Sequence, residues 1–336
     1  MKNKRKQNVL RRILAVRGMG QVITVTVGLI ILCIVFGILN PVFFSSKNVA
    51  NLFRQIAPIL IIGIGQSYVL ITGNIDLSIG SVVGMSCMIS ATLMTKGVSP
   101  IAALLITVVC CLAVGVLNGV LVAKCKLPPF IATLGTMTIA RGIAQIVNNN
   151  YNTGSIGEGA KGFRNFFYYG KTFGFYNTIW IALVLWLVFN FVLSKTRTGR
   201  HIYAIGSNVE ASRLSGVNVN ATTIKAYLVS SICACTVGLM TCATTGMGTM
   251  DAGNMYEMYA VAASVIGGVS TLGGQGILLG TVIGASIWGV LQNGLQFAGA
   301  PVAIRNITIG IIVVVSVLLD VVVRSGKPKK KKLAEL

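Results

Sequence analysis

The sequence predicts an all-α, polytopic membrane protein with about ten transmembrane helices, one or more of them broken or re-entrant. Three observations support this fold class. The chain of 336 residues is 54% apolar and only 10% charged, whereas an ordinary soluble domain carries about 25% charged residues. Long uncharged stretches recur along the chain, and roughly 20 apolar helical residues suffice to cross a bilayer. Nearly all of the Lys and Arg residues lie between these stretches or at the two ends.

The expected spans follow one another through mostly short connections. We place them at 21–39, 57–73, 77–95, 100–123, 129–148, 177–194, 222–246, 258–272, 276–298 and 304–323. The eighth span has fifteen residues, too few to cross a bilayer alone, so we expect a broken or re-entrant helix there. Glycine-rich stretches at 73–80 and 267–276 fall at span junctions, and transporters place their binding sites at such interruptions.

The distribution of positive charge predicts the orientation. Alternating the loops places twenty Lys and Arg residues on one side, in 1–20, 124–126, 195–225 and 324–332. Seven fall on the other side, and Arg141 lies within a span. Cytoplasmic loops carry the excess of Lys and Arg. We therefore expect a multi-pass protein of the cell membrane with both termini in the cytoplasm.

The domain organisation follows from the same pattern. We expect a basic cytoplasmic tail over 1–20, one transmembrane domain over 21–324 with a cytoplasmic loop at 195–221, and a second basic tail over 325–336. The second tail is expected to attract anionic lipid head groups. The formal charge of +21 does not indicate a nucleic-acid partner, because the basic residues sit at span ends and form no aromatic-studded stripe.

The motifs that carry enzyme chemistry are missing from the chain. It has one histidine, His201, and no Cys-x-x-Cys pair, which excludes the common zinc and haem signatures. It also has no Gly-x-x-x-x-Gly-Lys-Ser/Thr phosphate loop, so we do not expect it to hydrolyse ATP. No catalytic residue and no metal site is therefore predicted.

Two ionisable residues lie well inside apolar surroundings, Asp76 and Arg141. Asp76 is a candidate pathway or gate residue, since charges in membranes usually face a cavity or a partner. It is equally a candidate N-terminal helix cap, and both roles can hold at once. Arg141 requires an acceptor, which is either Asp76 or carbonyl groups at a span end, unless it snorkels outward. Asp251 and Glu257 flank the eighth span on the outside, where we expect them to be solvated or to contact a partner.

The cytoplasmic loop 195–221 contains the signature of a short helix. Residues 207–210, Ser-Asn-Val-Glu, fit a capping box in which the serine and the glutamate satisfy donors at the helix start. Gly216 supplies the left-handed stop. Ala211 and Leu214 lie three apart and form a small apolar knob on one face. A helix of under two turns is marginal alone, so it either docks into another protein, which we favour, or lies on its own membrane domain.

Four segments of the chain carry a specific pattern: GNIDLSIG at 73–80, FIATLGT at 130–136, GRHIYAIGSN and EASRLSG within 199–216, and VIGGVSTLGG at 265–274. In this order they resemble the ribose-type ABC importer permeases. The resemblance runs from about residue 20 to 324. It implies a homodimeric permease, a cytoplasmic ATPase with two tandem cassettes that uses ATP and Mg²⁺, and an extracytoplasmic sugar-binding protein. This chain would itself be no enzyme and bind no cofactor.

The resemblance also implies roles for individual residues. Residues 208–216 look like the helix that couples to the ATPase, and the coupling candidates are Asn208, Glu210, Ala211, Arg213, Leu214 and Gly216. A sugar path needs hydroxyl and amide groups more than charges, and the pathway candidates are Asn74, Asp76, Ser78, Ser81, Asn118, Thr136, Arg141 and Asn293. The sequence departs from the family pattern at Asn74, where a second glycine is common, and in loop 149–176, which would face the binding protein.

One function and two rivals follow. We expect the permease subunit of an ATP-driven ABC importer for a ribose-like monosaccharide, with the choice of sugar resting largely on the binding protein. An ion-coupled secondary transporter would need intramembrane carboxylates, and only Asp76 is well placed for that role. A non-transporting membrane scaffold or receptor would tolerate apolar substitutions around Asp76.

Overall fold

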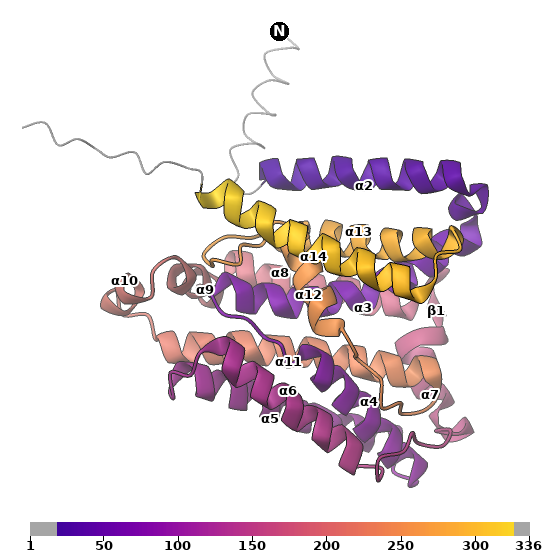
Figure 1. The fold of residues 1–336 in the computed structure, drawn as a ribbon. Helices are drawn as coiled ribbons and strands as arrows, with labels where there is room; N and C mark the ends of the chain where they lie inside the picture. The colour runs from indigo at the N-terminus through magenta and orange to yellow at the C-terminus, as the bar shows by residue number, and fades with distance from the viewer. Residues whose placement is uncertain (1–18, 326–336) are drawn as a thin grey trace, which may run out of the picture.

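The structure, a computed structural model, describes residues 19–325 and consists almost entirely of helices (Figure 1). In chain order the elements are α2 (Met19–Leu39), η1 (Pro41–Phe44), α3 (Ser46–Ile71), α4 (Ile79–Thr95), α5 (Pro100–Ala123), α6 (Pro129–Ile146), η2 (Glu158–Ala160), α7 (Lys161–Arg164), η3 (Asn165–Tyr169), β1 (Lys171–Thr172), β2 (Phe175–Tyr176), α8 (Asn177–Lys195), α9 (Arg197–Ser207), α10 (Val209–Leu214), α11 (Val219–Thr245), α12 (Tyr256–Ile266), α13 (Leu278–Phe297) and α14 (Val302–Ser325). The two strands form a short antiparallel hairpin. The tails expected at 1–20 and 325–336 lie outside the described residues except at their inner ends.

Within residues 19–325, six helices are long and apolar enough to span a bilayer by themselves: α2, α3, α5, α8, α11 and α13. α4 has 17 residues and α12 has 11, because the backbone leaves the helical conformation before α4 and after α12. α6 has 18 residues, but Arg141, Gln145 and several threonines lower its mean hydropathy. The all-α polytopic fold is confirmed, whereas the expected number of about ten transmembrane helices is not.

α3 and α11 form the centre of the bundle. α11 packs against α3, α4 and α5, and α3 also packs against α12 and α13. Every residue of α3 over 60–71 is buried, so this part of the helix has no solvent face and belongs to the interior. The outer helices instead expose large apolar side chains, such as Ile38 of α2 (77% exposed) and Ile101 of α5 (75% exposed). Such a surface suits hydrocarbon as the surrounding solvent.

Two irregular segments interrupt the helices and coincide with the glycine-rich stretches of the sequence. Segment 72–78 connects α3 to α4, and segment 267–277 connects α12 to α13. Gly73 and Gly274 have φ angles of 81° and 70°, a conformation that residues with a side chain rarely adopt. The two segments meet, because a Cβ on Gly273 would collide with Gly73; beside this contact the Gly274 N–H donates to the carbonyl of Ile71, the last residue of α3, at 2.8 Å.

The two ends of the bundle differ. α2 begins and α14 ends at the same end as α9 and α10, on the left of Figure 1. The opposite end carries α7, β1 and the rest of loop 149–176. That loop packs on the end of α11, where Arg164 Nε donates to the Ala243 carbonyl at 3.1 Å and Tyr169 Oη to the Thr244 carbonyl at 2.8 Å.

Candidate functional site

Asp76 lies in segment 72–78 and starts a chain of buried hydrogen bonds. Its Oδ1 accepts from the Ser78 N–H at 2.9 Å and from Ser78 Oγ at 2.6 Å. Its Oδ2 accepts from Ser230 Oγ of α11 at 2.6 Å. The Asp76 residue is only 1% exposed, and three donors offset much of the cost of burying a carboxylate. The cap residue of α4 is Ser78, so the expectation that Asp76 caps this helix is wrong; its carboxylate holds the turn before the helix.

The chain of hydrogen bonds continues into two more helices. Ser78 Oγ accepts from Asn118 Nδ2 of α5 at 2.8 Å. Asn118 Oδ1 accepts from Thr136 Oγ1 of α6 at 2.5 Å. Five side chains from α11, segment 72–78, α5 and α6 therefore form one network, and all are buried. The fold brings four of the expected pathway residues together here, in a closed arrangement in which their polar atoms bond to one another.

Arg141 lies on α6 and is half-buried. Its Nη1 donates to the Met250 carbonyl at 3.1 Å and to the Ala252 carbonyl at 2.8 Å. Its acceptors are carbonyls and not Asp76, but they lie in the connection between α11 and α12 and not at the end of a span as the sequence suggested. Gly84 of α4 permits this approach, because a Cβ there would collide with the Arg141 guanidinium and the Ala252 carbonyl.

Arg141 forms part of the wall of a cavity of about 430 Å³ between α4, α6 and the start of α12. We call it the Arg141 recess. Its polar lining is made by Ser81, Thr138, Arg141, Gln145, Asn254 and Glu257. Glu257 was expected to be solvated or to contact a partner outside the spans, but it is half-buried at this recess.

The other two pathway candidates, Asn74 and Asn293, lie apart from the network. Asn74 Nδ2 donates to Thr72 Oγ1 at 2.7 Å within segment 72–78. Asn293 of α13 forms a reciprocal pair of amide hydrogen bonds with Asn48 of α3, at 3.0 and 3.2 Å. The pair joins the end of α13 to the start of α3 and has no member in common with the Asp76 network.

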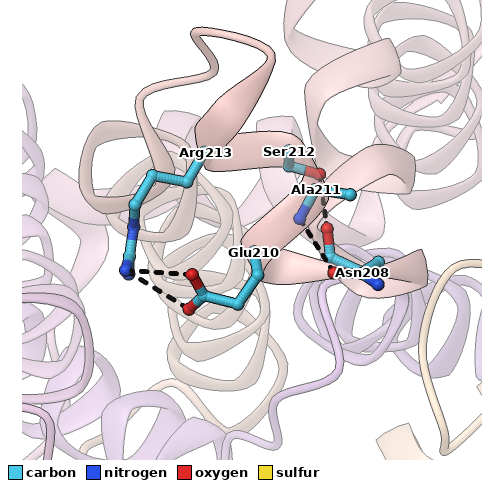
Figure 2. A network of polar contacts seen from close by, with 5 residues as sticks. All are labelled: Asn208, Glu210, Ala211, Ser212 and Arg213. Carbon is cyan, nitrogen blue, oxygen red and sulfur yellow. Dashed lines mark hydrogen bonds and ion pairs between the residues drawn. The ribbon is translucent and has the colours of Figure 1, made fainter.

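The expected coupling segment contains a helix, α10, at the outer edge of the bundle (Figure 1). Asn208 caps it: its Oδ1 accepts from the Ala211 N–H at 2.9 Å, and its carbonyl accepts from Ser212 Oγ at 2.7 Å (Figure 2). The capping box expected from the sequence is therefore wrong, since the cap is Asn208 and Ser207 Oγ donates instead to the Tyr203 carbonyl. Asn is as good a cap as Ser.

Glu210 has a different partner from the one expected. Its carboxylate accepts from Arg213 Nη1 at 3.2 and 3.4 Å (Figure 2), and both side chains are largely exposed. An exposed pair of this kind contributes little to stability, so both groups are available to a partner. Gly216 ends the helix with a φ of 81°, which confirms the left-handed stop.

The knob expected on α10 is exposed. Leu214 is 89% exposed, and Ala211 is exposed beside it. Ser212, on the other side of the helix, is buried. The helix thus presents its apolar side chains outward and does not fold them onto its own membrane domain, which favours the docking alternative.

A second helix in the same loop, α9, links α10 to the irregular segments. Its buried residues are Gly199, Ile202 and Ile205. Gly206 touches the Ile71 carbonyl and the Gly274 nitrogen so closely that a Cβ would collide with both. The sequence predicted internal structure in this loop but not α9.

Tyr203 of α9 makes a further link. Its hydroxyl donates to the Gly276 carbonyl at 2.6 Å. Burial raises the pKa of Tyr203 to about 12, so the hydroxyl keeps its proton at neutral pH and remains a donor. α9 is therefore bonded to segment 267–277 and pressed against the end of α3.

Sequence reasoning missed several of these residues. Ser230 sits in a span rich in Ser, Thr and Cys, and nothing in the pattern distinguishes it. Gln145 could have been found, because Thr138, Arg141 and Gln145 recur at intervals of three and four and mark one face of a helix. A second cavity of about 430 Å³, which we call the aromatic hollow, includes Tyr259, Trp288 and Gln292 and was not expected.

The described residues contain no cluster of the side chains that most often bind metal ions. Within 19–325 there is no group of three or more His, Cys, Asp or Glu residues that could hold one. The eight cysteines are free thiols, and five of them are buried.

Comparison with known proteins adds an independent line of evidence. Residues 48–317 match the family described as "Branched-chain amino acid transport system / permease component". The chain is similar to the ribose import permease protein RbsC of Bacillus subtilis (strain 168), with 34% identity over 87% of this chain and 90% of the relative. For RbsC of Escherichia coli (strain K12) the identity is 35%, over 88% of this chain and 92% of the relative. For the D-allose transport system permease protein AlsC of the same strain it is 33%, over 87% and 89%. No solved structure gives a match.

Proposed function

Since this chain belongs to the family of transport-system permease components that its residues 48–317 match, we propose that it is the membrane subunit of an ATP-driven importer of a ribose-like monosaccharide. One observation carries the choice of cargo: relatives similar over almost nine-tenths of this chain are permeases for ribose or D-allose. As a permease component the chain transports and is not an enzyme. Neither rival, the ion-coupled transporter or the scaffold, finds support among these relatives.

In this proposal α9, α10 and both tails lie in the cytoplasm of a cell-membrane protein. The excess of Lys and Arg in 1–20, 195–225 and 324–332 supports this orientation. So does the common position of the start of α2, the end of α14 and α10 (Figure 1). The ten crossings of one transmembrane domain, 21–324, are then the six long helices together with α4, α6, α14 and α12 with segment 267–277. The two tails contact anionic lipid.

Coupling runs through α10. Its exposed knob seats in a cytoplasmic ATPase with two tandem cassettes, which uses ATP and Mg²⁺ while this chain binds neither. The coupling residues are Asn208, Glu210, Ala211, Arg213, Leu214 and Gly216. Closure of the ATPase moves α10 and α9 together, and the contacts of Gly206 and Tyr203 carry that movement to the two irregular segments.

The permease works with a second copy of itself. The Arg141 recess opens beside Ile139 and Ile143 of α6, which are exposed. A hollow that contains an arginine and a glutamate is costly to face with hydrocarbon, and non-helical backbone such as 246–255 needs protein or water around it. A second copy facing α6 covers this surface and leaves a wet path between the two subunits.

The path is controlled by the Asp76 network. In the closed arrangement Asp76, Ser78, Asn118 and Thr136 bond to one another; movement of segment 72–78 exchanges these bonds for bonds to water and sugar. Asn74 and Asn293, which lie apart from the network, remain candidates for the path by their amide groups alone. Loop 149–176, at the end opposite α10, receives the extracytoplasmic sugar-binding protein.

Reconstitution tests the proposal. The permease is placed in liposomes with a tandem-cassette ATPase and a sugar-binding protein, and uptake of labelled D-ribose is measured with and without ATP. Uptake should require ATP and should persist when ion gradients are collapsed. Glu210→Lys should abolish uptake without affecting membrane insertion, because Glu210 is exposed and, in the part of the chain that the structure describes, its side chain bonds only to Arg213.

Asn220→Lys is the matched control, since Asn220 is an exposed residue in the first turn of α11 and this change adds the same kind of charge outside α10. It should leave uptake unchanged. Full uptake by Glu210→Lys with the ATPase still bound would refute the coupling role, and uptake that survives without the ATPase would refute the importer.

A further inference from the structure

The Arg141 recess differs from the Asp76 network because its hydrogen-bonding groups are left open. Over residues 19–325, the side chains of Gln145, Asn254 and Glu257 form no hydrogen bond or ion pair with another side chain. In the Asp76 network, by contrast, every member is bonded to another member. Polar side chains that gather around a cavity without bonding to one another are available to a ligand.

Arg141 is fixed by hydrogen bonds to the protein, yet some of its N–H donors remain free to bind a ligand. Among residues 19–325, the hydrogen bonds of its guanidinium run from Nη1 alone, to the carbonyls of Met250 and Ala252. A guanidinium has five N–H donors in a fixed plane, so the donors on Nε and Nη2 remain for a ligand. The two hydrogen bonds of Nη1 fix the plane of the guanidinium before a ligand arrives, which reduces the conformational entropy lost on binding.

The two charges of the recess have opposite signs and stay apart. No ion pair joins Arg141 to Glu257, so more than 4 Å separates their charged atoms. A simple anion would be attracted by Arg141 but repelled by Glu257, and a cation the reverse, whereas a neutral molecule can bond to both without repulsion from either. The cavity of about 430 Å³ lies within the range of roughly 300–1,000 Å³ usual for small-molecule sites. A monosaccharide fits this site, because it is neutral, compact and rich in hydroxyl groups.

The recess is also joined to the moving parts. A Cβ at Gly80 would collide with the Glu257 carboxylate, and one at Gly84 with the Arg141 guanidinium. Both charged groups thus rest directly on the first turns of α4. The start of α4 is anchored through Ser78 to Asp76, so any shift of segment 72–78 changes the shape of the recess.

We propose that the Arg141 recess is a low-affinity monosaccharide site of the permease itself, in which Arg141, Gln145, Asn254 and Glu257 bind the sugar hydroxyls and reject charged sugars. This inference rests on the proposed function and deepens it, because it gives the permease its own part in choosing the cargo. The carboxylate, the two amides and the guanidinium are planar groups that can each bond to neighbouring hydroxyls of one ring. The short contacts to α4 then release the sugar when α4 moves.

Direct binding is the first test. Purified wild-type permease in lipid nanodiscs is mixed with D-ribose, D-allose or the anionic sugar acid D-ribonate, and saturation-transfer NMR detects weak binding. We expect signals from the two neutral sugars and none from D-ribonate. Glu257→Gln should weaken ribose binding by about tenfold, the loss of one hydrogen bond to a charged group, and should admit D-ribonate. A role in structure alone would not produce that gain.

Variants of the two cavities supply the control. Gln145→Leu in the Arg141 recess should raise the KM for ribose uptake several-fold, while Gln292→Leu in the aromatic hollow should leave it unchanged. Elution volume and melting temperature of each variant check folding, and Glu257→Asp, which keeps the charge, should restore rejection of D-ribonate. An effect of Gln292→Leu without an effect of Gln145→Leu would move the site to the aromatic hollow and overturn the proposal.

The failure of this proposal and of the importer can be told apart. If the complex transports ribose with ATP but the Gln145 and Glu257 variants bind and transport like wild type, the recess is not a sugar site and the importer stands. If ribose binding is lost in these variants but no complex transports ribose, the importer is wrong and the site remains.

Discussion

Single buried polar residues stabilise this protein when they are bonded and not when they are orphaned. Ser230 Oγ donates to the Asp76 carboxylate at 2.6 Å inside the bundle. Thr92 of α4 is buried as well, but its hydroxyl has no hydrogen-bond partner within residues 19–325. Losing a donor to a buried carboxylate leaves that charge short of a partner, whereas losing an unpaired hydroxyl removes only a desolvated group.

The two hydroxyls make a matched test. Ser230→Ala should lower the stability of the permease by about 1.5–3 kcal/mol, the usual value for a hydrogen bond to a charged group. Thr92→Val, which keeps the shape of the side chain, should leave stability unchanged or raise it. Melting temperatures in the same detergent measure both. Equal effects of the two substitutions would mean that the Asp76 network does not hold α11 to α4.

At the scale of elements, α9 is the part that ties the coupling helix to the membrane domain. It is short and bears charged residues such as Arg197 and Arg200, so it has little reason to be stable alone. Its position depends on the close approach of Gly206 to the Ile71 carbonyl and the Gly274 nitrogen, and on the hydrogen bond from Tyr203 to segment 267–277. Because Gly206 and Gly274 have no side chain, the two backbones can approach each other this closely.

Adding a methyl group at Gly206 tests whether this close contact matters for transport. Gly206→Ala should displace α9 from the irregular segments and reduce ATP-driven uptake at least about tenfold, the equivalent of about 1.4 kcal/mol of lost coupling. Gly28→Ala on α2 is the control, because nothing lies within 4 Å of a Cβ there and α2 is not part of the proposed contact between the two copies; it should leave uptake unchanged. Normal uptake with Gly206→Ala would show that α9 does not transmit the movement.

For the whole molecule, charge and shape agree on which ends belong together. The end that carries α9 and α10 also carries the start of α2 and the end of α14 (Figure 1), and the chain's basic residues concentrate in the same segments. Loop 149–176, with its exposed aromatic Phe173, lies at the opposite end. Hydrocarbon between the two ends forces them to opposite sides of the membrane.

Labelling of single cysteines tests that orientation. In a Cys125→Ser background, which removes the exposed native thiol, Phe173→Cys should react with a membrane-impermeant maleimide in intact cells. Leu214→Cys, equally exposed in the fold, should react only after the cells are permeabilised. Labelling of Leu214→Cys in intact cells would place α10 outside the cell and end the coupling proposal.

Much of the membrane architecture was predictable from the sequence alone. Eight expected spans agree with a helix to within three residues at each end, namely α2, α4, α5, α6, α8, α11, α13 and α14, and the short eighth span in the chain is observed as α12 followed by segment 267–277. Such predictions succeed because the cost of apolar surface in water and of charge in hydrocarbon depends on local composition alone. The same locality explains why the cap of α10 was placed one residue early: Ser207 and Asn208 are both good caps, and only their neighbours in the fold separate them.

The meeting of residues distant in the chain was not predictable from composition or spacing. Asp76 and Ser230 are 154 positions apart, and Arg141 meets carbonyls more than a hundred positions away. Each partner has several equivalent candidates along the chain, and the packing of α4 between α6, α11 and α12 selects one of them. The sequence alone therefore determined the apolar spans, because the free energy of transferring each residue into lipid depends on that residue and not on its neighbours in the fold. The tertiary structure alone determined the polar network and the recess, because they exist only where packed helices bring particular atoms within hydrogen-bonding distance.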